Sequence, residues 1–169
     1  MVSLRLIDSS DTANIVKWRN LPNVQSNFIF QDNITVDSHE NWIKSHIKKG
    51  KAIQFIIVTE EYGDIGTVYL RDINEQHRKA EFGIFIGEDY ARGKGYGTMA
   101  ARLILQYAFA KLNLNKVFLR VFSDNIGAIK SYESVGFLEE GYFIEDVIIK
   151  GAPKNMVFMA ILQSQYNYS

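Results

Sequence analysis

The sequence predicts a strand-rich α+β domain. Two observations lead to this class: about seven β-prone runs separated by turn residues, and about four helical patterns, two early and two late in the chain. In addition, only two prolines occur, and no stretch has the composition of a linker or a repeat. A chain of 169 residues can bury one real core, so residues 1–169 are expected to form a single domain.

The first part of the chain supplies one strand and two helices. Residues 2–7 alternate enough to form a strand. A helix is predicted over 11–20, because apolar residues recur there at helical spacing and Leu21-Pro22-Asn23 breaks the pattern. Asp37 or Ser38 is placed to cap a second helix, which also carries apolar residues at helical spacing.

The middle of the chain is rich in strands. Two β-prone runs, 52–59 and 67–73, are joined by the turn Glu61-Tyr62-Gly63-Asp64, which predicts a hairpin. A further strand is expected over 80–86.

The last part of the chain alternates helices and strands. A helix is predicted over 125–135, and Gly136 follows it directly. Glycine suits a helix end that needs a left-handed residue. The predicted elements are a helix, a strand, a helix and a long hairpin with its turn at 151–154, over residues 98–112, 116–122, 125–135, 137–150 and 155–162.

A glycine-rich loop, Arg92-Gly93-Lys94-Gly95-Tyr96-Gly97, lies between the strand that ends at Ile86 and the helix that starts near Thr98. Glycines let the backbone approach a phosphate group, and the free N–H groups at a helix start point toward it. Two basic side chains add positive charge. The loop therefore predicts a site for a phosphate-bearing cofactor.

Composition excludes several classes of function. Nineteen basic residues balance nineteen acidic ones, so neither nucleic acid nor a membrane surface is expected as a partner. The chain has no cysteine, which excludes disulfides and a cysteine nucleophile. The three histidines, His39, His46 and His77, lack metal-ligand spacing, and no metal is expected. No leader-like or membrane-spanning run is present, which indicates a cytoplasmic protein.

A second motif lies one strand beyond the glycine loop. It runs from Asn125 to Phe137 and has the pattern Asn-x-x-Ala-x-x-x-Tyr followed by Gly-Phe. Together with Arg92-x-x-Gly95-x-Gly97, it resembles the signature motifs of the GNAT superfamily of acetyl-CoA-dependent N-acetyltransferases. The resemblance covers essentially the whole chain. It implies a mixed, mostly antiparallel central sheet of about seven strands flanked by about four helices.

The resemblance assigns roles to residues of this chain. The glycine loop would bind the CoA pyrophosphate, and the strand at 84–86 would pair with the pantetheine amides and stabilise the thioester oxyanion. Asn125 would contact the pantetheine arm, Lys130 would reach the adenosine phosphates, and Tyr132 would protonate the departing thiolate. The cofactor-binding residues implied in this way are Ile84, Phe85, Ile86, Arg92, Gly93, Lys94, Gly95, Tyr96, Gly97, Thr98, Asn125 and Lys130.

The chemistry also requires a group that accepts the proton of the amine, because a free alkyl amine is mostly charged at neutral pH. Glu81 is the candidate base, since it lies on the strand that leads to the thioester site. A water relay is the alternative, with Glu81 paired to Arg78 or Lys79 instead. The missing cysteine favours direct attack of the amine in a ternary complex.

Two resemblances point to different acceptor amines. The N-terminal half is similar to bacterial UDP-4-amino-sugar N-acetyltransferases in two stretches, Trp18-Arg19-Asn20 and Ile34-Thr35-x-x-x-His39-x-x-Trp42. The run from Asn74 to Phe82 and the tail Ile161 to Tyr166 instead resemble bacterial spermidine N-acetyltransferases. The core is also shared with the ribosomal-protein N-terminal acetyltransferases.

Charge favours the first alternative. A polyamine needs a cluster of carboxylates, and the segment 21–47 offers only Asp32, Asp37 and Glu40. Arg19 suits a nucleotide diphosphate, and the aromatic residues Phe28, Phe30 and Trp42 suit a sugar or a base, unless they are simply core. An amino-sugar nucleotide is therefore the preferred acceptor, with a polyamine or a protein N-terminus as alternatives.

Two further expectations concern the whole protein. A non-catalytic acyl-CoA sensor is a less favoured reading, because Tyr132, Asn125 and the glycine loop are all retained. The apolar strand from Met156 to Leu162 suggests a homodimer, although it would also suit closure of its own sheet.

Overall fold

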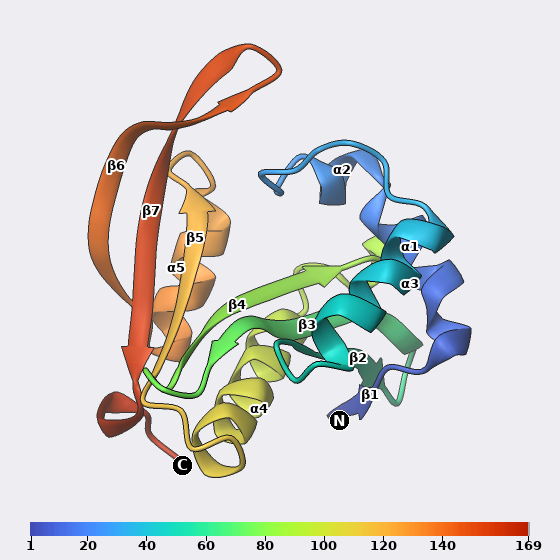
Figure 1. The fold of residues 1–169 in the computed structure, drawn as a ribbon, viewed down its shortest axis with the longest axis horizontal. Helices are drawn as coiled ribbons and strands as arrows, with labels where there is room; N and C mark the ends of the chain where they lie inside the picture. The colour runs from blue at the N-terminus through green and yellow to red at the C-terminus, as the bar shows by residue number, and fades with distance from the viewer. Residues whose placement is uncertain (169) are drawn as a thin grey trace.

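The computed structural model describes residues 1–168. Its centre is one seven-stranded sheet in the order β1-β2-β3-β4-β5-β7-β6 (Figure 1). The neighbouring strands are antiparallel except β4 and β5, which are parallel. The strands are β1 (Val2–Leu6), β2 (Ile53–Thr59), β3 (Gly63–Asn74), β4 (Lys79–Ile86), β5 (Lys116–Phe122), β6 (Leu138–Ile149) and β7 (Ala152–Leu162). The predicted α+β class and mostly antiparallel sheet are confirmed.

Five α-helices accompany the sheet, one more than expected. The additional helix is α2, which begins at the proline of the predicted break because proline suits the first helical position. The α-helices are α1 (Thr12–Arg19), α2 (Pro22–Gln25), α3 (Val36–Trp42), α4 (Tyr96–Ala110) and α5 (Ile126–Val135). The shorter helical segments are η1 (Ser9–Asp11), η2 (Ile43–Ile47), η3 (Asp89–Ala91) and η4 (Gln163–Gln165).

Several element boundaries differ from the sequence prediction. Helix α3 is capped by Thr35, and Ser38 serves as the reciprocal partner in a capping box. Helix α4 begins at Tyr96, inside the glycine loop, because its N-cap is the left-handed Gly95. Strand β7 begins at Ala152, so the hairpin turn is shorter than predicted.

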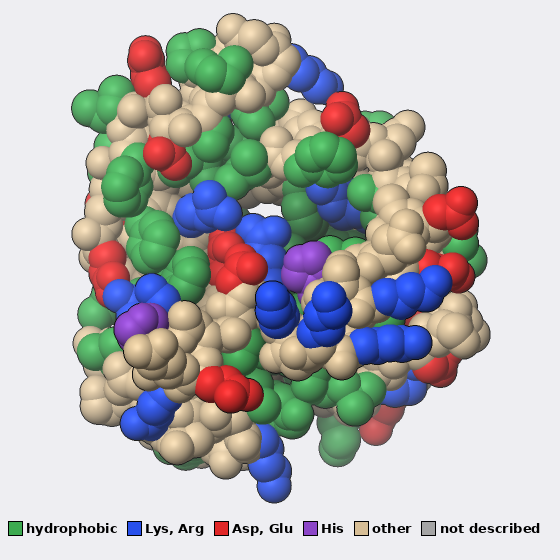
Figure 2. Space-filling model, viewed as in Figure 1, with side chains coloured by type: hydrophobic (Ala, Val, Ile, Leu, Met, Phe, Trp, Pro, Cys, Tyr) green, Lys and Arg blue, Asp and Glu red, His purple; other side chains and the backbone are tan. Residues whose placement is uncertain are grey.

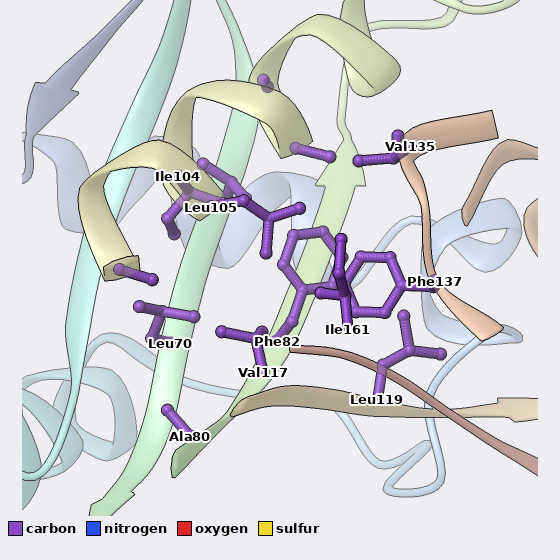
Figure 3. Packing of buried hydrophobic residues seen from close by; sticks show 14 of the residues in the cluster. Leu70, Ala80, Phe82, Ile104, Leu105, Val117, Leu119, Val135, Phe137 and Ile161 are labelled. Atoms are coloured by element: carbon purple, nitrogen blue, oxygen red, sulfur yellow. The ribbon is translucent and has the colours of Figure 1, made fainter. Parts of the chain in front are cut away.

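The two faces of the sheet carry different cores. On β2, Phe55 and Ile57 join the large cluster that includes α4, whereas Ile56 packs with Ile15 and Trp18 of α1. This follows from the alternation of side chains along a strand. Figure 3 shows the large cluster, in which Phe82 of β4 lies beside residues of α4, β5 and the segment after α5. Helices α1 and α4 therefore cover opposite faces.

Strands β4 and β5 are joined only at their beginnings. Their parallel register covers Lys79 to Glu81 on β4 and Lys116 to Phe118 on β5, and Figure 1 shows the strands diverging beyond that point. The rest of β4 is paired with β3 alone on one side. Backbone N–H and C=O groups that point toward the gap are therefore available to a ligand.

Candidate functional site

A cleft of about 1160 Å³ occupies the gap between β4 and β5. Its walls come from α1, α3, the loop between α2 and α3, the glycine loop and α5. Figure 2 shows the molecule hollowed near its middle, with basic and acidic side chains around the opening. The cleft brings together segments that are far apart in the sequence.

The glycine loop forms one end of the cleft. Gly93 and Gly95 have φ angles of +70° and +80°, and a Cβ atom at either position would meet no atom within 4 Å. No side chain caps the start of α4, so its first N–H groups face the open space above the glycines. The positive end of the helix dipole adds to this attraction for anions. The loop is therefore suited to hold an anion, and its assignment to the CoA pyrophosphate stays a prediction.

The two basic side chains of the loop are used differently. The Arg92 guanidinium donates to the carbonyl oxygen of Ile86 at 2.8 Å and fixes the loop to the end of β4. The Lys94 ammonium donates to the Tyr62 hydroxyl, and Lys94 does not line the cleft. Lys94 therefore braces the loop against the β2–β3 hairpin, while Arg92 remains at the cleft wall.

The strand that is predicted to pair with pantetheine lines the cleft, and the pairing itself stays a prediction. Ile84, Phe85 and Ile86 all contribute to its wall. Gly83 precedes them, and a Cβ atom at Gly83 would come within 2.2 Å of the Tyr69 ring. Glycine is therefore required there, because the Tyr69 ring lies directly over the strand at the point where the gap opens.

Tyr132 reaches the cleft from α5. Its ring packs edge-on against Phe82 and Phe137, at centroid distances of 5.8 and 6.0 Å. Burial raises the pKa of Tyr132 to about 12. The phenol is therefore protonated at neutral pH, which is the form that a proton donor requires.

Asn125 also lines the cleft, but both ends of its amide have partners. Its Oδ1 accepts from the N–H of Ala128 at 3.2 Å, which caps α5, and its Nδ2 donates to Asn27 Oδ1 at 3.1 Å. Asn27 belongs to the segment after α2, so this bond connects the two sides of the cleft. The predicted pantetheine contact of Asn125 stays a prediction.

Of the predicted cofactor residues, Lys94 and Lys130 are the two that do not line the cleft. Lys130 is exposed on α5. Thr98 lines the cleft, and its hydroxyl lies 3.2 Å from that of Ser131, which links α4 to α5. The proposed contact of Lys130 with adenosine phosphates stays untested.

Glu81 lies where β4 and β5 separate, and its side chain is only 7% exposed. Arg71 donates to it through Nε at 3.1 Å, and Arg120 does the same at 3.1 Å. The partners are therefore not Arg78 and Lys79, the basic neighbours in the sequence. Both carboxylate oxygens are engaged by guanidinium groups.

The tertiary structure brings these two arginines to Glu81 from other strands. Arg71 is the cross-strand partner of Glu81 on β3, and Arg120 follows Phe118, the partner on β5. The sequence analysis missed both. The hairpin register would have found Arg71, whereas no local pattern indicates Arg120.

The other end of the cleft is built by α1 and the loop between α2 and α3. Trp18 is core, because its ring covers Gly87 and its Nε1 donates to Glu88 at 2.8 Å. Asn20 exchanges two hydrogen bonds of 2.8 Å with the backbone of Ile34, which holds the loop against α1. Trp42 is half-buried and lines the cleft.

Arg19 lies between these two anchors and is 7% exposed. Its Nη2 donates to the carbonyl oxygen of Phe30, and its guanidinium carbon lies 3.5 Å from the centre of the Phe28 ring. Both aromatic residues line the cleft. The acidic residues of the same region, Asp32, Asp37 and Glu40, are exposed and do not line it.

Two buried polar residues complete this end. His39 Nδ1 lies 3.2 Å from the Thr12 hydroxyl, and burial lowers the pKa of the imidazole. Gln54 donates from Nε2 to the Thr67 hydroxyl at 2.9 Å. Both line the cleft, so a neutral histidine and an amide lie at the end built by α1 and α3.

The structure gives two findings about the described part of the chain. Within residues 1–168, no helix has both the length and the apolar character to cross a membrane. Over the same range, no group of three or more His, Cys, Asp or Glu side chains is arranged to hold a metal ion.

Similarity to known proteins extends over nearly the whole chain. A family model described as an acetyltransferase (GNAT) domain matches residues 2–138. Spermidine N(1)-acetyltransferase from Vibrio cholerae serotype O1 is 33% identical over 165 residues, which cover 98% of this chain and 95% of that protein. The name of that relative specifies spermidine, a polyamine, as its acceptor.

Solved structures agree with this match. The crystal structure of spermidine N-acetyltransferase from Vibrio cholerae in complex with CoA and spermine has a TM-score of 0.91 at 33% identity, covering 98% of this chain and 97% of that one. A dodecameric structure of the Vibrio cholerae enzyme in an intermediate state has a TM-score of 0.84 at 32% identity, covering 99% and 96%.

Proposed function

The chain belongs to the GNAT acetyltransferases, acetyl-CoA-dependent enzymes that acetylate amines, and we propose that its acceptor is the primary amine of a small, negatively charged molecule. Within that class we propose an amino-sugar nucleotide. The observation that carries this proposal is the charge of the cleft. Away from the glycine loop, the described residues that line it include three arginines, Arg19, Arg71 and Arg120, against one carboxylate, Glu81.

The balance at the acceptor end opposes a polycation. Glu81 is already paired with Arg71 and Arg120, so that trio keeps a net positive charge. Arg19 adds another. Like charges about 4 Å apart repel by about 1 kcal/mol in water and about 4 kcal/mol at an effective dielectric constant of 20. An acceptor that carries phosphate groups gains from the same field.

A polyamine is the second candidate, and the named relatives support it. In this chain the carboxylates of the acceptor segment, Asp32, Asp37 and Glu40, are exposed outside the cleft. A polyamine would therefore need a different arrangement of that segment. A protein N-terminus is the third acceptor to compare.

The donor side of the reaction uses the glycine loop and the diverging strand. Bound acetyl-CoA supplies an acetyl group on a thioester. Gly93, Gly95 and the start of α4 would hold its pyrophosphate, and the free N–H groups of β4 would orient the thioester carbonyl. Tyr132, protonated at neutral pH, would donate its proton to the thiolate that leaves.

The amine must lose a proton before or during attack. Among the described residues of the cleft, Glu81 and His39 have the side chains suited to accept it, directly or through water. Glu81 has both oxygens engaged by arginines, which favours a positioning role in which it aligns Arg71 and Arg120. The alternative role of Glu81 as the base predicts that its loss changes the pH–rate profile.

The domain count and the oligomeric state of the enzyme are proposed as well. We infer that residues 1–169 act as one acetyltransferase domain that forms a homo-oligomer. Strand β6 lies at the edge of the sheet and exposes Leu138, Phe143, Ile144 and Ile148, apolar side chains that are suited to contact another subunit. The dodecameric relative supports an oligomer, while the dimer itself stays a prediction.

A thiol-release assay tests the acceptor class. The enzyme is given acetyl-CoA with a UDP-4-amino sugar, spermidine or an N-terminal peptide, and kcat/KM is compared. We expect the highest value for the amino-sugar nucleotide, with Tyr132→Phe as the background control. A higher value for spermidine would reject the anionic acceptor and establish the second candidate. Acetyl-CoA binding without transfer to any amine would instead identify a sensor.

A further inference from the structure

The hydroxyl of Tyr69 is a polar group on the cleft wall that the described part of the protein leaves free. Tyr69 lines the cleft, and its hydroxyl forms no hydrogen bond within residues 1–168. It is also not one of the polar atoms that are shut off from solvent without a partner, so the open space of the cleft reaches it. A free polar group in the wall of a cleft is available to a ligand.

The side chain of Tyr69 crosses from β3 to β4. Tyr69 and Gly83 are cross-strand partners, and a Cβ atom at Gly83 would lie 2.2 Å from Cζ and 2.4 Å from Oη of Tyr69. Neighbouring strands are about 4.8 Å apart, so the ring spans that distance and its hydroxyl ends over β4. Gly83 lies just beyond Glu81, the last residue of β4 that pairs with β5. The hydroxyl is therefore at the point where the backbone of β4 becomes open to the cleft.

Tyr69 and Tyr132 approach this point from opposite faces of the sheet. Val68 and Leu70, the neighbours of Tyr69, belong to the large core cluster with α4, so Tyr69 points to the face that α1 covers. Tyr132 packs against the large cluster through Phe82. Burial is the main cause of the raised pKa of Tyr132, and Tyr69 is the second, which places the two phenols within electrostatic reach of each other. The gap between β4 and β5 is therefore flanked by two phenols.

The Tyr69 phenol is protonated at neutral pH. Burial raises its pKa, and the nearby guanidinium groups of Arg71 and Arg19 offset only part of this increase. A neutral phenol can donate one hydrogen bond and can accept others through its lone pairs. Tyr69 is therefore suited to bind a polar group of a substrate and not to act as a base.

The two phenols correspond to the two partners of an acetyl transfer. Tyr132 is proposed to serve the leaving thiolate, and it belongs to the side of the sheet that α4 covers. The side that α1 covers is left for the amine, and it carries Tyr69 together with Glu81, two residues before Gly83 on β4. An attacking nitrogen must be held about 3–3.5 Å from the carbonyl carbon, in line with its orbital.

We propose that the Tyr69 hydroxyl accepts a hydrogen bond from the acceptor amine and holds its nitrogen over the thioester carbon. Tyr69 keeps its own proton throughout, and the proton of the amine leaves by another route. The inference goes beyond the proposed function, because it rests on acetyl transfer to an amine and applies to each of the acceptors compared above. It also gives Gly83 a role, since any larger residue there would displace the phenol.

The test compares Tyr69→Phe with the wild type in the thiol-release assay, using a UDP-4-amino sugar, spermidine and an N-terminal peptide. Phenylalanine keeps the ring over Gly83 and removes only the hydroxyl. With the amine that the wild type uses best, kcat/KM is expected to fall by about 10-fold or more, because a hydrogen bond to the nucleophile and its alignment are lost together. Acetyl-CoA affinity, the melting temperature and the shape of the pH–rate profile should be unchanged.

Tyr107→Phe is the matched control. Tyr107 is also half-buried, its hydroxyl also has no hydrogen bond within residues 1–168, and it does not line the cleft. This variant should keep the kcat/KM of the wild type. An equal loss in both variants would show a general effect of removing a hydroxyl and would overturn the proposal.

Other outcomes also decide the proposal. Unchanged kcat/KM in Tyr69→Phe would overturn it and leave the ring with the sole role of covering Gly83. An equal loss of acetyl-CoA affinity, a lower melting temperature or a lost limb of the pH–rate profile would overturn it as well, because these indicate a donor-binding, structural or proton-transfer role. A wild type that prefers spermidine would reject the anionic acceptor alone, since the effect of Tyr69→Phe is measured with whichever amine is used. Absence of transfer to all three amines would overturn both proposals.

Discussion

Asn20 and Ile34 exchange two hydrogen bonds of 2.8 Å, from the amide Nδ2 to the carbonyl oxygen and from the backbone N–H to Oδ1. This pair closes the segment between α1 and α3 into a loop whose residues line the end of the cleft proposed for the acceptor. The two motifs that resembled amino-sugar acetyltransferases are thus parts of one structural unit. Its integrity is expected to control acceptor affinity.

Replacing Asn20 by alanine removes both bonds and loosens that loop. Two hydrogen bonds together contribute about 2 kcal/mol, which predicts a KM for the acceptor that rises about 10-fold or more while acetyl-CoA affinity is retained. Steady-state kinetics with each substrate varied in turn provide the measurement. Asn155→Ala is the matched control, since it also removes two amide hydrogen bonds, in the β6–β7 hairpin. An equal effect of both variants on KM would contradict the prediction.

Tyr132→Phe keeps the ring that packs on Phe82 and Phe137 and removes only the hydroxyl. Turnover is expected to fall by roughly 10²-fold or more, because the leaving thiolate loses its proton donor. Acetyl-CoA affinity, measured by calorimetry, should be nearly intact. Tyr107→Phe is the control, a tyrosine packed on Phe55 that does not line the cleft. Full activity of Tyr132→Phe would remove Tyr132 as the acid.

Gly95→Val combines a strained backbone with a blocked pyrophosphate site. Gly151 is a matched control, because its φ of +81° is close to the +80° of Gly95 and its surroundings are equally open. Both substitutions should cost about 1–2 kcal/mol of stability from the left-handed conformation. Only Gly95→Val is expected to weaken acetyl-CoA binding. Equal affinities in the two variants would refute the assignment of the loop.

Glu81→Gln distinguishes a positioning residue from a base. Because both carboxylate oxygens are bound by Arg71 and Arg120, we expect the acceptor KM to rise and the acidic limb of the pH–rate profile to persist. The kinetic profile is measured from about pH 5 to 9 with saturating acetyl-CoA. A flattened acidic limb with unchanged KM would show that Glu81 takes the amine proton.

His39 is expected to make stability depend on pH. Its pKa is lowered by burial in the folded protein, so the unfolded chain binds a proton more readily as the pH falls below about 6.5. The free energy of unfolding should therefore decrease in that range, and less steeply in His39→Gln. Urea unfolding at pH 7.5 and 5.5 measures the difference, with the exposed His77→Gln as control. Identical pH dependence in His39→Gln and wild type would contradict the burial argument.

Local sequence determined the conformation of the two motifs that are proposed to bind the donor. The glycine loop and the Asn125-to-Phe137 motif are contiguous, and their conformations follow from glycine, helix capping and strand periodicity, which act over a few residues. The sheet class and most strands were predictable for the same reason. The short helix α2 and the start of α4 could not be predicted in this way, because proline and glycine permit a helix start as well as a helix break.

Only the tertiary structure decided the environment of the acceptor. Glu81 was visible as a carboxylate on a strand, but its partners Arg71 and Arg120 arrive from neighbouring strands through register and a parallel crossover. Arg19 was visible as a positive charge, but its burial, with no ion pair to a carboxylate among residues 1–168, depends on how α1, the following loop and β3 pack together. Electrostatic fields depend on distance in space and on exclusion of water, neither of which is encoded in local spacing.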